Sequence, residues 1–223
     1  MNKSVRLTSL DVFRGMTMAT MILVNMASLP DEGKKYLLLD HAAWHGYTIA
    51  DFVFPFFLYI IGGSMAFSLA KYTSGSAPIT KSVYWQIIRR SLILFGLGLI
   101  LNNLVWNYNF TDPKIFANLD SLRIMGVLQR IGIAFFFAST AILTLSHRGL
   151  WILAGGILVG YWLILTFIPA LDNADGVFTK LGNFGSYIDR LIITPAHLHK
   201  GSGSMSDPEG LFGTLPSIVN ILF

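Results

Sequence analysis

The sequence predicts an all-α protein, a polytopic bundle of helices that cross a membrane. Of its 223 residues 53% are hydrophobic, and only 13% are charged. Soluble domains carry roughly 25% charged residues, so this chain has about half the charge that a water-facing surface requires. Apolar runs recur along the chain, and several approach the roughly 20 residues that a helix needs to cross about 30 Å of hydrocarbon. Composition therefore argues against a soluble enzyme, a disordered chain and a disulfide-rich secreted module.

Five apolar runs are predicted to be complete membrane spans. They cover residues 10–29, 48–70, 91–106, 122–145 and 150–170. A sixth run begins near Leu211, but the residues from there to Phe223 would rise only about 20 Å as a helix, which is too short to cross. We therefore expect residues 1–223 to form a single transmembrane domain, the N-terminal part of a longer protein.

The basic residues favour a cytoplasmic N-terminus, because cytoplasmic loops of membrane proteins are enriched in lysine and arginine. One set of alternate connections carries Lys3, Arg6, Lys71, Lys81, Arg89, Arg90 and Arg148, and the other carries Lys34, Lys35, Lys114 and Arg123. This modest bias places residues 30–47 and 171–210 on the far side of the membrane. The net charge of +4 is therefore attributed to the basic residues that set the orientation in the membrane, and no nucleic-acid partner is expected. A bacterial cytoplasmic (inner) membrane is the expected location.

Polar residues mark one face of the first predicted span. Asp11 and Arg14 are three residues apart, which places them within reach of each other on a helix. Asn25 follows Arg14 by eleven residues and returns to nearly the same azimuth at 3.6 residues per turn. A charge near the centre of a span costs roughly 2.5–3.5 kcal/mol on insertion scales, so such residues usually face a bundle interior. An ion pair and an interhelical amide hydrogen bond are the structural alternative to a functional role.

The second span begins after His41 and carries Asp51 in its outer part. Buried charges are normally paired, and Arg130 in the outer part of the fourth span is the predicted partner of Asp51. Further along the second span, Gly62-Gly63-Ser64 permits close approach of another helix. His41 and His45 are four residues apart, but no clear third ligand accompanies them and the chain has no cysteine. No metal site is predicted.

Arg89 and Arg90 precede the third apolar run on the expected cytoplasmic side. Two interpretations are open. They anchor the helix according to the excess of positive charge in cytoplasmic loops, or they form a guanidinium clamp for phosphates presented from the cytoplasm.

Five ordered segments resemble one known family. They are residues 6–15 (RLTSLDVFRG), Val24-Asn25, residues 41–55 (HAAWHGYTIADFVFP), residues 126–132 (GVLQRIG) and residues 207–216 (DPEGLFGTLP). Together they are similar to the heparan-α-glucosaminide N-acetyltransferase family, and the match touches nearly the whole chain.

The resemblance implies an acetyl transfer across the membrane, from cytoplasmic acetyl-CoA as co-substrate to an amino-sugar amine on the other face. The family's essential histidine falls on His41 and its active-site asparagine on Asn25. A histidine can take up a proton near neutral pH, so His41 either deprotonates the attacking amine or carries a transient acetyl group. The supporting residues are expected to be Asp51, Arg130, Gln129, Asp11 and Arg14, and Arg89 and Arg90 are the candidates for contact with the CoA phosphates.

Two other classes of function remain as alternatives. A membrane transporter for sugars or oligosaccharides would use Asp51 and Arg130 as gate or coupling residues. A structural membrane subunit would have no chemistry of its own. The expected partners are membrane lipid and the glycan substrate, and a homodimer with a second copy of the chain is left open.

Overall fold

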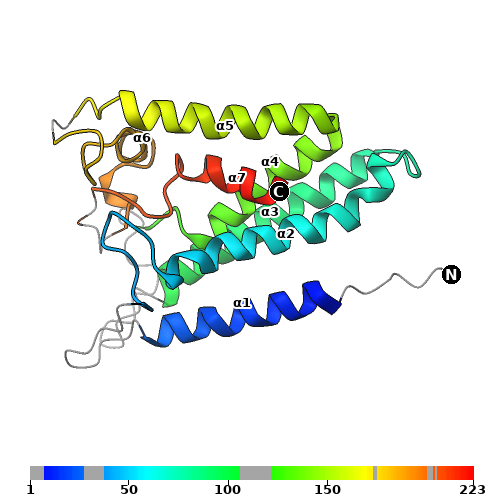
Figure 1. Ribbon diagram of the computed structural model, residues 1–223, viewed down its shortest axis with the longest axis horizontal. Coiled ribbons are helices and arrows are strands. Elements are labelled where there is room, and N and C mark those ends of the chain that lie inside the picture. Colours follow the sequence, from blue (N-terminus) through cyan, green and yellow to red (C-terminus); the bar gives the residue numbers. More distant parts are fainter. Residues whose placement is uncertain (1–7, 28–37, 106–121, 173–174, 200–202, 204) are drawn as a thin grey trace.

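The computed structural model describes residues 8–27, 38–105, 122–172, 175–199, 203 and 205–223, and in these ranges the regular structure is helical. The long helices run alongside one another as a bundle (Figure 1). The elements are α1 (Thr8–Ala27), α2 (Ile49–Thr73), α3 (Lys81–Ile100), a π-helical turn (Leu101–Val105), α4 (Val127–Thr144), α5 (His147–Phe167), α6 (Phe184–Ile193), a 3-10 turn (Pro195–His197) and α7 (Thr214–Leu222). The predicted all-α membrane bundle is confirmed.

Four of the described helices are long and apolar enough to cross a membrane: α2, α3 with the start of its π-helical turn, α4 and α5. The remaining predicted span, residues 10–29, corresponds to α1, which has 20 residues but does not meet the same criterion for hydropathy. Asp11, Arg14 and Asn25 account for the difference, because each of these polar side chains lowers the mean hydropathy of the helix. The described helices therefore support a membrane bundle without fixing the number of spans at five.

The core lies between α2, α3, α4 and α7. Its fully or nearly fully buried side chains include Leu58, Met65, Ile87, Ala134, Phe135, Ile218 and Ile221. The two remaining long helices are peripheral, since α1 packs on α2 and α5 packs on α7. Only 6% of the apolar stretch of α5 is buried within the described chain. Its outward side chains are apolar, as expected of a helix that faces lipid.

Helix boundaries differ from the prediction most at α3. This helix begins at Lys81, ten residues before the predicted run, because Val83 and Ile87 point into the core one turn apart. Arg89 and Arg90 consequently lie inside the helix, about 13 Å of axial rise beyond its start, and not at its first residues. The prediction also missed α6 and the 3-10 turn within residues 171–210. Both elements are too short to stand out by hydropathy, and the region around them has mixed charge.

Gly62 sets the approach of α2 to α7. A Cβ atom at this position would overlap the backbone carbonyl oxygen of Ile221, whereas a Cβ at the adjacent Gly63 would lie 3.4 Å from the flexible Leu10 side chain. The predicted close approach at Gly62-Gly63-Ser64 is therefore confirmed. At Gly62 the neighbouring atoms belong to the backbone of Ile221, so they cannot easily move to admit a side chain.

Replacing Gly62 by alanine should lower the stability of the bundle by about 1–3 kcal/mol, the usual cost of overpacking a well-packed interior. The same change at Gly63 is the matched control and should cost much less, because its nearest neighbour can move. Unfolding of the purified protein in detergent would measure both. Equal losses at the two positions would show that the α2–α7 contact is not as tight as described.

Candidate active site

His41 and Asp51 form the centre of a polar site at one end of the bundle. The His41 ring Nδ1 lies 2.7 Å from Asp51 Oδ1. Asp51 also accepts the backbone N–H of Thr48 through Oδ2 at 2.8 Å, so the carboxylate caps the start of α2 while it binds the ring. The Thr48 hydroxyl donates to the carbonyl of Asp40 at 2.7 Å, which folds residues 38–48 back over the helix end.

This geometry defines the chemistry of the imidazole. An ionised carboxylate can only accept hydrogen bonds, so Nδ1 of His41 carries the hydrogen that points to Asp51. The second ring nitrogen, Nε2, is then left with a lone pair that can take up a proton or attack a carbonyl carbon. The His41 side chain is 62% exposed, so a substrate can reach it. The pair has the arrangement of a general base oriented by a carboxylate.

The segment that carries His41 is fastened to a distant part of the chain. Trp44 Nε1 donates to the carbonyl oxygen of Phe178 at 2.7 Å, which joins residues 38–48 to the connection between α5 and α6. Figure 1 shows these two connections at the same end of the bundle, beside the start of α2. The site is therefore built from loops that belong to separate regions of the sequence.

The predicted ion pair between Asp51 and Arg130 is wrong. Arg130 Nε donates to Ser217 Oγ at 2.8 Å, and its terminal nitrogens donate to the carbonyl oxygens of Gly213 and Pro208. Its guanidinium also lies 4.9 Å from the ring centre of Phe54, one turn along α2 from Asp51. Residues 208–217 return to the first turn of α4 and satisfy the guanidinium, so Arg130 fixes the start of α7.

Asn25 lies in the last turn of α1, at the same end of the bundle as His41. The adjacent Val24 is buried at 3% exposure and packs with Ala50 and Val53 at the start of α2. Asn25 itself is exposed, and within the described residues no hydrogen bond joins it to His41. The connection between them, residues 28–37, lies outside the described residues. The structure therefore places Asn25 near the site without assigning its partner.

Asp11 and Arg14 lie toward the opposite end of α1. Their side chains approach to 3.6 Å, which confirms the predicted proximity, and Arg14 Nη2 donates to Ser64 Oγ at 3.0 Å. Ser64 is thirteen residues beyond Asp51 along α2, roughly 20 Å of helix. Arg14 therefore joins α1 to α2 at a point far from the His41–Asp51 pair.

Gln129 is a fully buried polar residue between α3 and α4. Within the described chain neither side-chain amide atom has a hydrogen-bond partner. Gly98 makes room for it, because a Cβ there would overlap the amide oxygen. The nearby Asn102 donates to the carbonyl oxygen of Met125 at 3.1 Å. Gln129 therefore belongs to a polar layer of the α3–α4 interface, one residue before Arg130.

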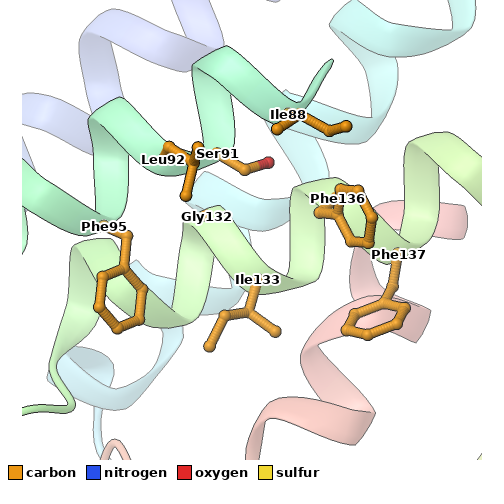
Figure 2. A pocket seen from close by; sticks show the side chains of 8 residues that line it. All are labelled: Ile88, Ser91, Leu92, Phe95, Gly132, Ile133, Phe136 and Phe137. Carbon is orange, nitrogen blue, oxygen red and sulfur yellow. The ribbon is translucent and has the colours of Figure 1, made fainter. Parts of the chain in front are cut away.

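Arg89 and Arg90 are exposed on α3, with the Arg90 guanidinium 5.6 Å from the ring centre of Phe135. Close by, an apolar hollow of about 380 Å³ lies between α3 and α4 (Figure 2). It is lined by Ile88, Ser91, Leu92, Phe95, Gly132, Ile133, Phe136 and Phe137. None of the predicted site residues lines this hollow, so it is separate from the His41–Asp51 pair.

A second cluster of charges, which the sequence did not reveal, lies before α4 and α7. Arg123 contacts Asp207 at 2.6 Å and also binds Glu209, and the Asp207 side chain is fully buried. Burial lowers the pKa of Arg123, but hydrogen bonds and charge from both carboxylates outweigh it and raise the pKa above its ordinary value. The only sequence signal for this cluster was the pair of acidic residues in the segment DPEG, residues 207–210. The region before this segment has no strong hydropathy that would have drawn attention to it.

Asp189 of α6 is a buried carboxylate that forms no ion pair with another described residue. It accepts the backbone N–H of Phe212 at 3.2 Å, and Gly210 lies so near that a Cβ there would overlap the carboxylate. Burial raises the pKa of Asp189 to about 6, although backbone hydrogen bonds oppose the shift. A raised carboxyl pKa means that this group stabilises the fold most at low pH and that its contribution is lost as the pH rises through about 6.

Replacing Asp189 by asparagine should therefore flatten the pH dependence of stability. As the pH rises from 4 to 7, the wild-type protein should lose on the order of 2 kcal/mol relative to the variant. The comparison with the variant matters because burial lowers the pKa of His199, which makes stability rise with pH and so opposes the effect of Asp189. Thermal unfolding in detergent at a series of pH values would measure the difference. Parallel curves for the two proteins would contradict the prediction.

The fold and the site define an integral-membrane helical bundle with a carboxylate-oriented histidine at one end. Residues 6–180 match the model of the family described as heparan-alpha-glucosaminide N-acetyltransferase, catalytic. The chain belongs to this family, which confirms the resemblance seen in the sequence.

Two relatives bear this name. The chain is 31% identical over 256 residues to heparan-alpha-glucosaminide N-acetyltransferase of Homo sapiens and 30% identical over 258 residues to that of Mus musculus. Each match covers 96% of this chain, which spans 37% of the length of each relative.

Proposed function

We propose that the full-length protein is a membrane N-acetyltransferase that moves an acetyl group from acetyl-CoA to the amine of an amino sugar. The observation that carries the proposal is the His41–Asp51 contact of 2.7 Å with the histidine ring exposed. The names of the relatives support the reaction class and the glucosamine-type acceptor. The protein is proposed to lie in a bacterial inner membrane with its N-terminus on the cytoplasmic side. His41 would then lie on the far face of the membrane, and acetyl-CoA would approach from the cytoplasm.

In the proposed reaction, Nε2 of His41 accepts a proton from the amine while the nitrogen attacks the thioester carbonyl. The C–N bond forms, the C–S bond breaks, and the proton passes to the leaving thiolate of CoA. Asp51 is a positioning residue, because it holds the ring and stabilises its protonated form. General-base assistance of this kind contributes typically 10²–10⁴-fold.

Asn25 is proposed to orient the acetyl carbonyl or the His41 ring, since the packing of Val24 on α2 holds the end of α1 beside the site. Arg130 is proposed to support the site through Phe54, one turn from Asp51. A transient acetyl-histidine is the second form of the mechanism, with Nε2 itself as the nucleophile. Acetyl label retained on the protein in the absence of acceptor, and lost in His41→Ala, would distinguish it from direct transfer.

The direct test uses the full-length protein in sealed vesicles with labelled acetyl-CoA and glucosamine on opposite sides. The proposal expects labelled N-acetylglucosamine on the acceptor side. Uptake of glucosamine without acetylation would instead support the transporter, and the absence of both would favour a structural subunit or a different acceptor.

Arg89 and Arg90 are proposed to contact the phosphates of CoA, because both are exposed and lie in the half of α3 that begins at the expected cytoplasmic end. Replacing both by glutamine should raise the KM for acetyl-CoA by about tenfold or more, since hydrogen bonds to a charged group are typically worth 1.5–3 kcal/mol. The KM for the acceptor should not change.

Arg148→Gln is the matched control for this double variant. Arg148 is also exposed and lies at the start of α5, on the same side of the bundle, so its loss removes a basic charge without touching α3. An unchanged affinity for acetyl-CoA in the Arg89/Arg90 variant would leave these residues with only a role in topology.

A further inference from the structure

The helix α6 has its polar and apolar faces reversed relative to a helix that faces water. Asp189 is 4% exposed and Arg190 is 7% exposed, whereas the next two residues, Leu191 and Ile192, are 62% and 58% exposed. In a water-facing helix the charged residues lie outside and the apolar residues cover the core. Here both charged residues point into the protein, on the same side as Ile193, and Leu191 and Ile192 point out.

The buried face of α6 has its partners within the protein. Arg190 binds Asp172 at 2.7 Å and donates to the carbonyl oxygen of Met205 at 2.8 Å, and Asp189 accepts the N–H of Phe212. These contacts fix which side of the helix points inward. The outward position of Leu191 and Ile192 is therefore a consequence of the fold.

The start of α6 lies level with the end of a membrane-spanning helix. α5 has 21 residues, a length of roughly 31 Å that matches the hydrocarbon core. The N–H of Ala170 donates to the carbonyl oxygen of Gly182 at 2.8 Å, which ties the chain before α6 to the residues that follow α5. A Cβ at Gly185 would lie 3.9 Å from the Leu165 side chain, in the last turn of α5.

The direction of α6 also differs from that of the spans. Figure 1 looks down the axis of α6, while α5 and the other long helices run across the view. A helix that crosses the direction of the spans at the end of one of them lies along the plane of the membrane. Exposed apolar side chains continue from α5 into this region, where Phe167 is 69% and Leu171 77% exposed.

We propose that α6 is an interfacial helix whose outward face, Leu191 and Ile192, inserts into the lipid at the boundary between acyl chains and headgroups. Amphipathic helices seated in this way bury an apolar face in the outer part of the acyl region. The occupant of this face is lipid, because the apolar surface is continuous with that of a membrane span. The seating also holds the segment before α7, through Asp189 and Arg190, at a fixed depth beside the candidate active site.

The test uses the absence of cysteine in this chain. Single cysteines at residues 191 and 192 of the full-length protein, with any cysteine beyond residue 223 replaced, would carry a nitroxide label in lipid vesicles. Collision rates with oxygen, which concentrates in lipid, and with a water-soluble nickel chelate would be measured. Val159→Cys on the exposed face of α5 is the lipid reference, and Ala196→Cys, exposed just after α6, is the aqueous reference.

At residues 191 and 192 the ratio of oxygen to nickel collisions should be several-fold higher than at residue 196 and close to that at residue 159. A ratio equal to that at residue 196 would show that α6 faces water. Low collision rates with both reagents would show that protein covers the helix, either a later part of the chain or a second copy. Either result overturns the proposal, and neither depends on acetyltransferase activity.

Discussion

Replacing His41 by alanine should lower acetyl transfer by the full-length protein by about 10²–10⁴-fold, the usual contribution of a positioned general base. The loss should appear in kcat, because the imidazole acts on the proton that leaves during the reaction and contributes little to binding. The fold should survive, because the His41 side chain is 62% exposed and the capping of α2 by Asp51 does not need the ring.

His45→Ala is the matched control for this prediction. His45 lies in the same exposed segment, and within the described chain no hydrogen bond fixes its ring. Its replacement should change the rate by no more than a few fold. Turnover of His41→Ala at nearly the wild-type rate would remove His41 from the chemistry, and the proposed function would then need another base.

The variant Asp51→Asn tests, in the same assay, whether Asp51 only caps α2 or also positions the His41 ring for the reaction. The amide retains the shape of the side chain but removes the charge that stabilises a protonated ring. If Asp51 only caps α2, the variant should lose stability while kcat of the folded protein stays the same. If Asp51 positions His41, kcat should fall as well, because the ring loses the carboxylate that holds its Nδ1.

Hydropathy predicted the helices whose environment is simple. α2 and α5 begin and end within a few residues of the predicted runs, because the cost of polar groups in hydrocarbon limits where charges can stand. α3 differed because only two of its first ten residues, Val83 and Ile87, are buried, which is too few to form an apolar run. α6 was missed because its ten residues are too few for a span and its charged residues are buried by tertiary contacts.

The sequence predicted which polar residues gather at one end of the bundle, but not how Asp51 and Arg130 pair. His41, Asn25, Asp51 and Arg130 all lie toward the same end of the bundle, but Asp51 binds His41 and not Arg130. The local signal was Thr48-x-x-Asp51, a spacing that marks an acidic residue capping a helix start. Such a cap folds the preceding segment back onto the helix and brings His41 with it. The partners of Arg130 are 78 to 87 residues away in the chain, and no local pattern reveals them.

Replacing Arg123 by methionine should destabilise the protein by about 3–5 kcal/mol, because it leaves the fully buried Asp207 carboxylate without its counter-charge. Adding Asp207→Asn should restore much of the loss, since the double variant no longer contains that uncompensated charge. Unfolding in detergent of the wild type, the two single variants and the double variant would give the coupling energy of the pair.

Arg14→Met provides the comparison for an ion pair that is longer and less buried. Arg14 and Asp11 approach only to 3.6 Å, and their side chains are 45% and 34% exposed, so this loss should cost no more than about 1 kcal/mol. The loss of Arg123 should cost more because it leaves the buried carboxylate of Asp207 without a counter-charge. It also removes the ion pair between Arg123 and Glu209. If the losses from Arg123→Met and Asp207→Asn simply add in the double variant, the pair is not coupled. The 207–213 segment that leads to Arg130 and α7 would then be held by its backbone contacts alone.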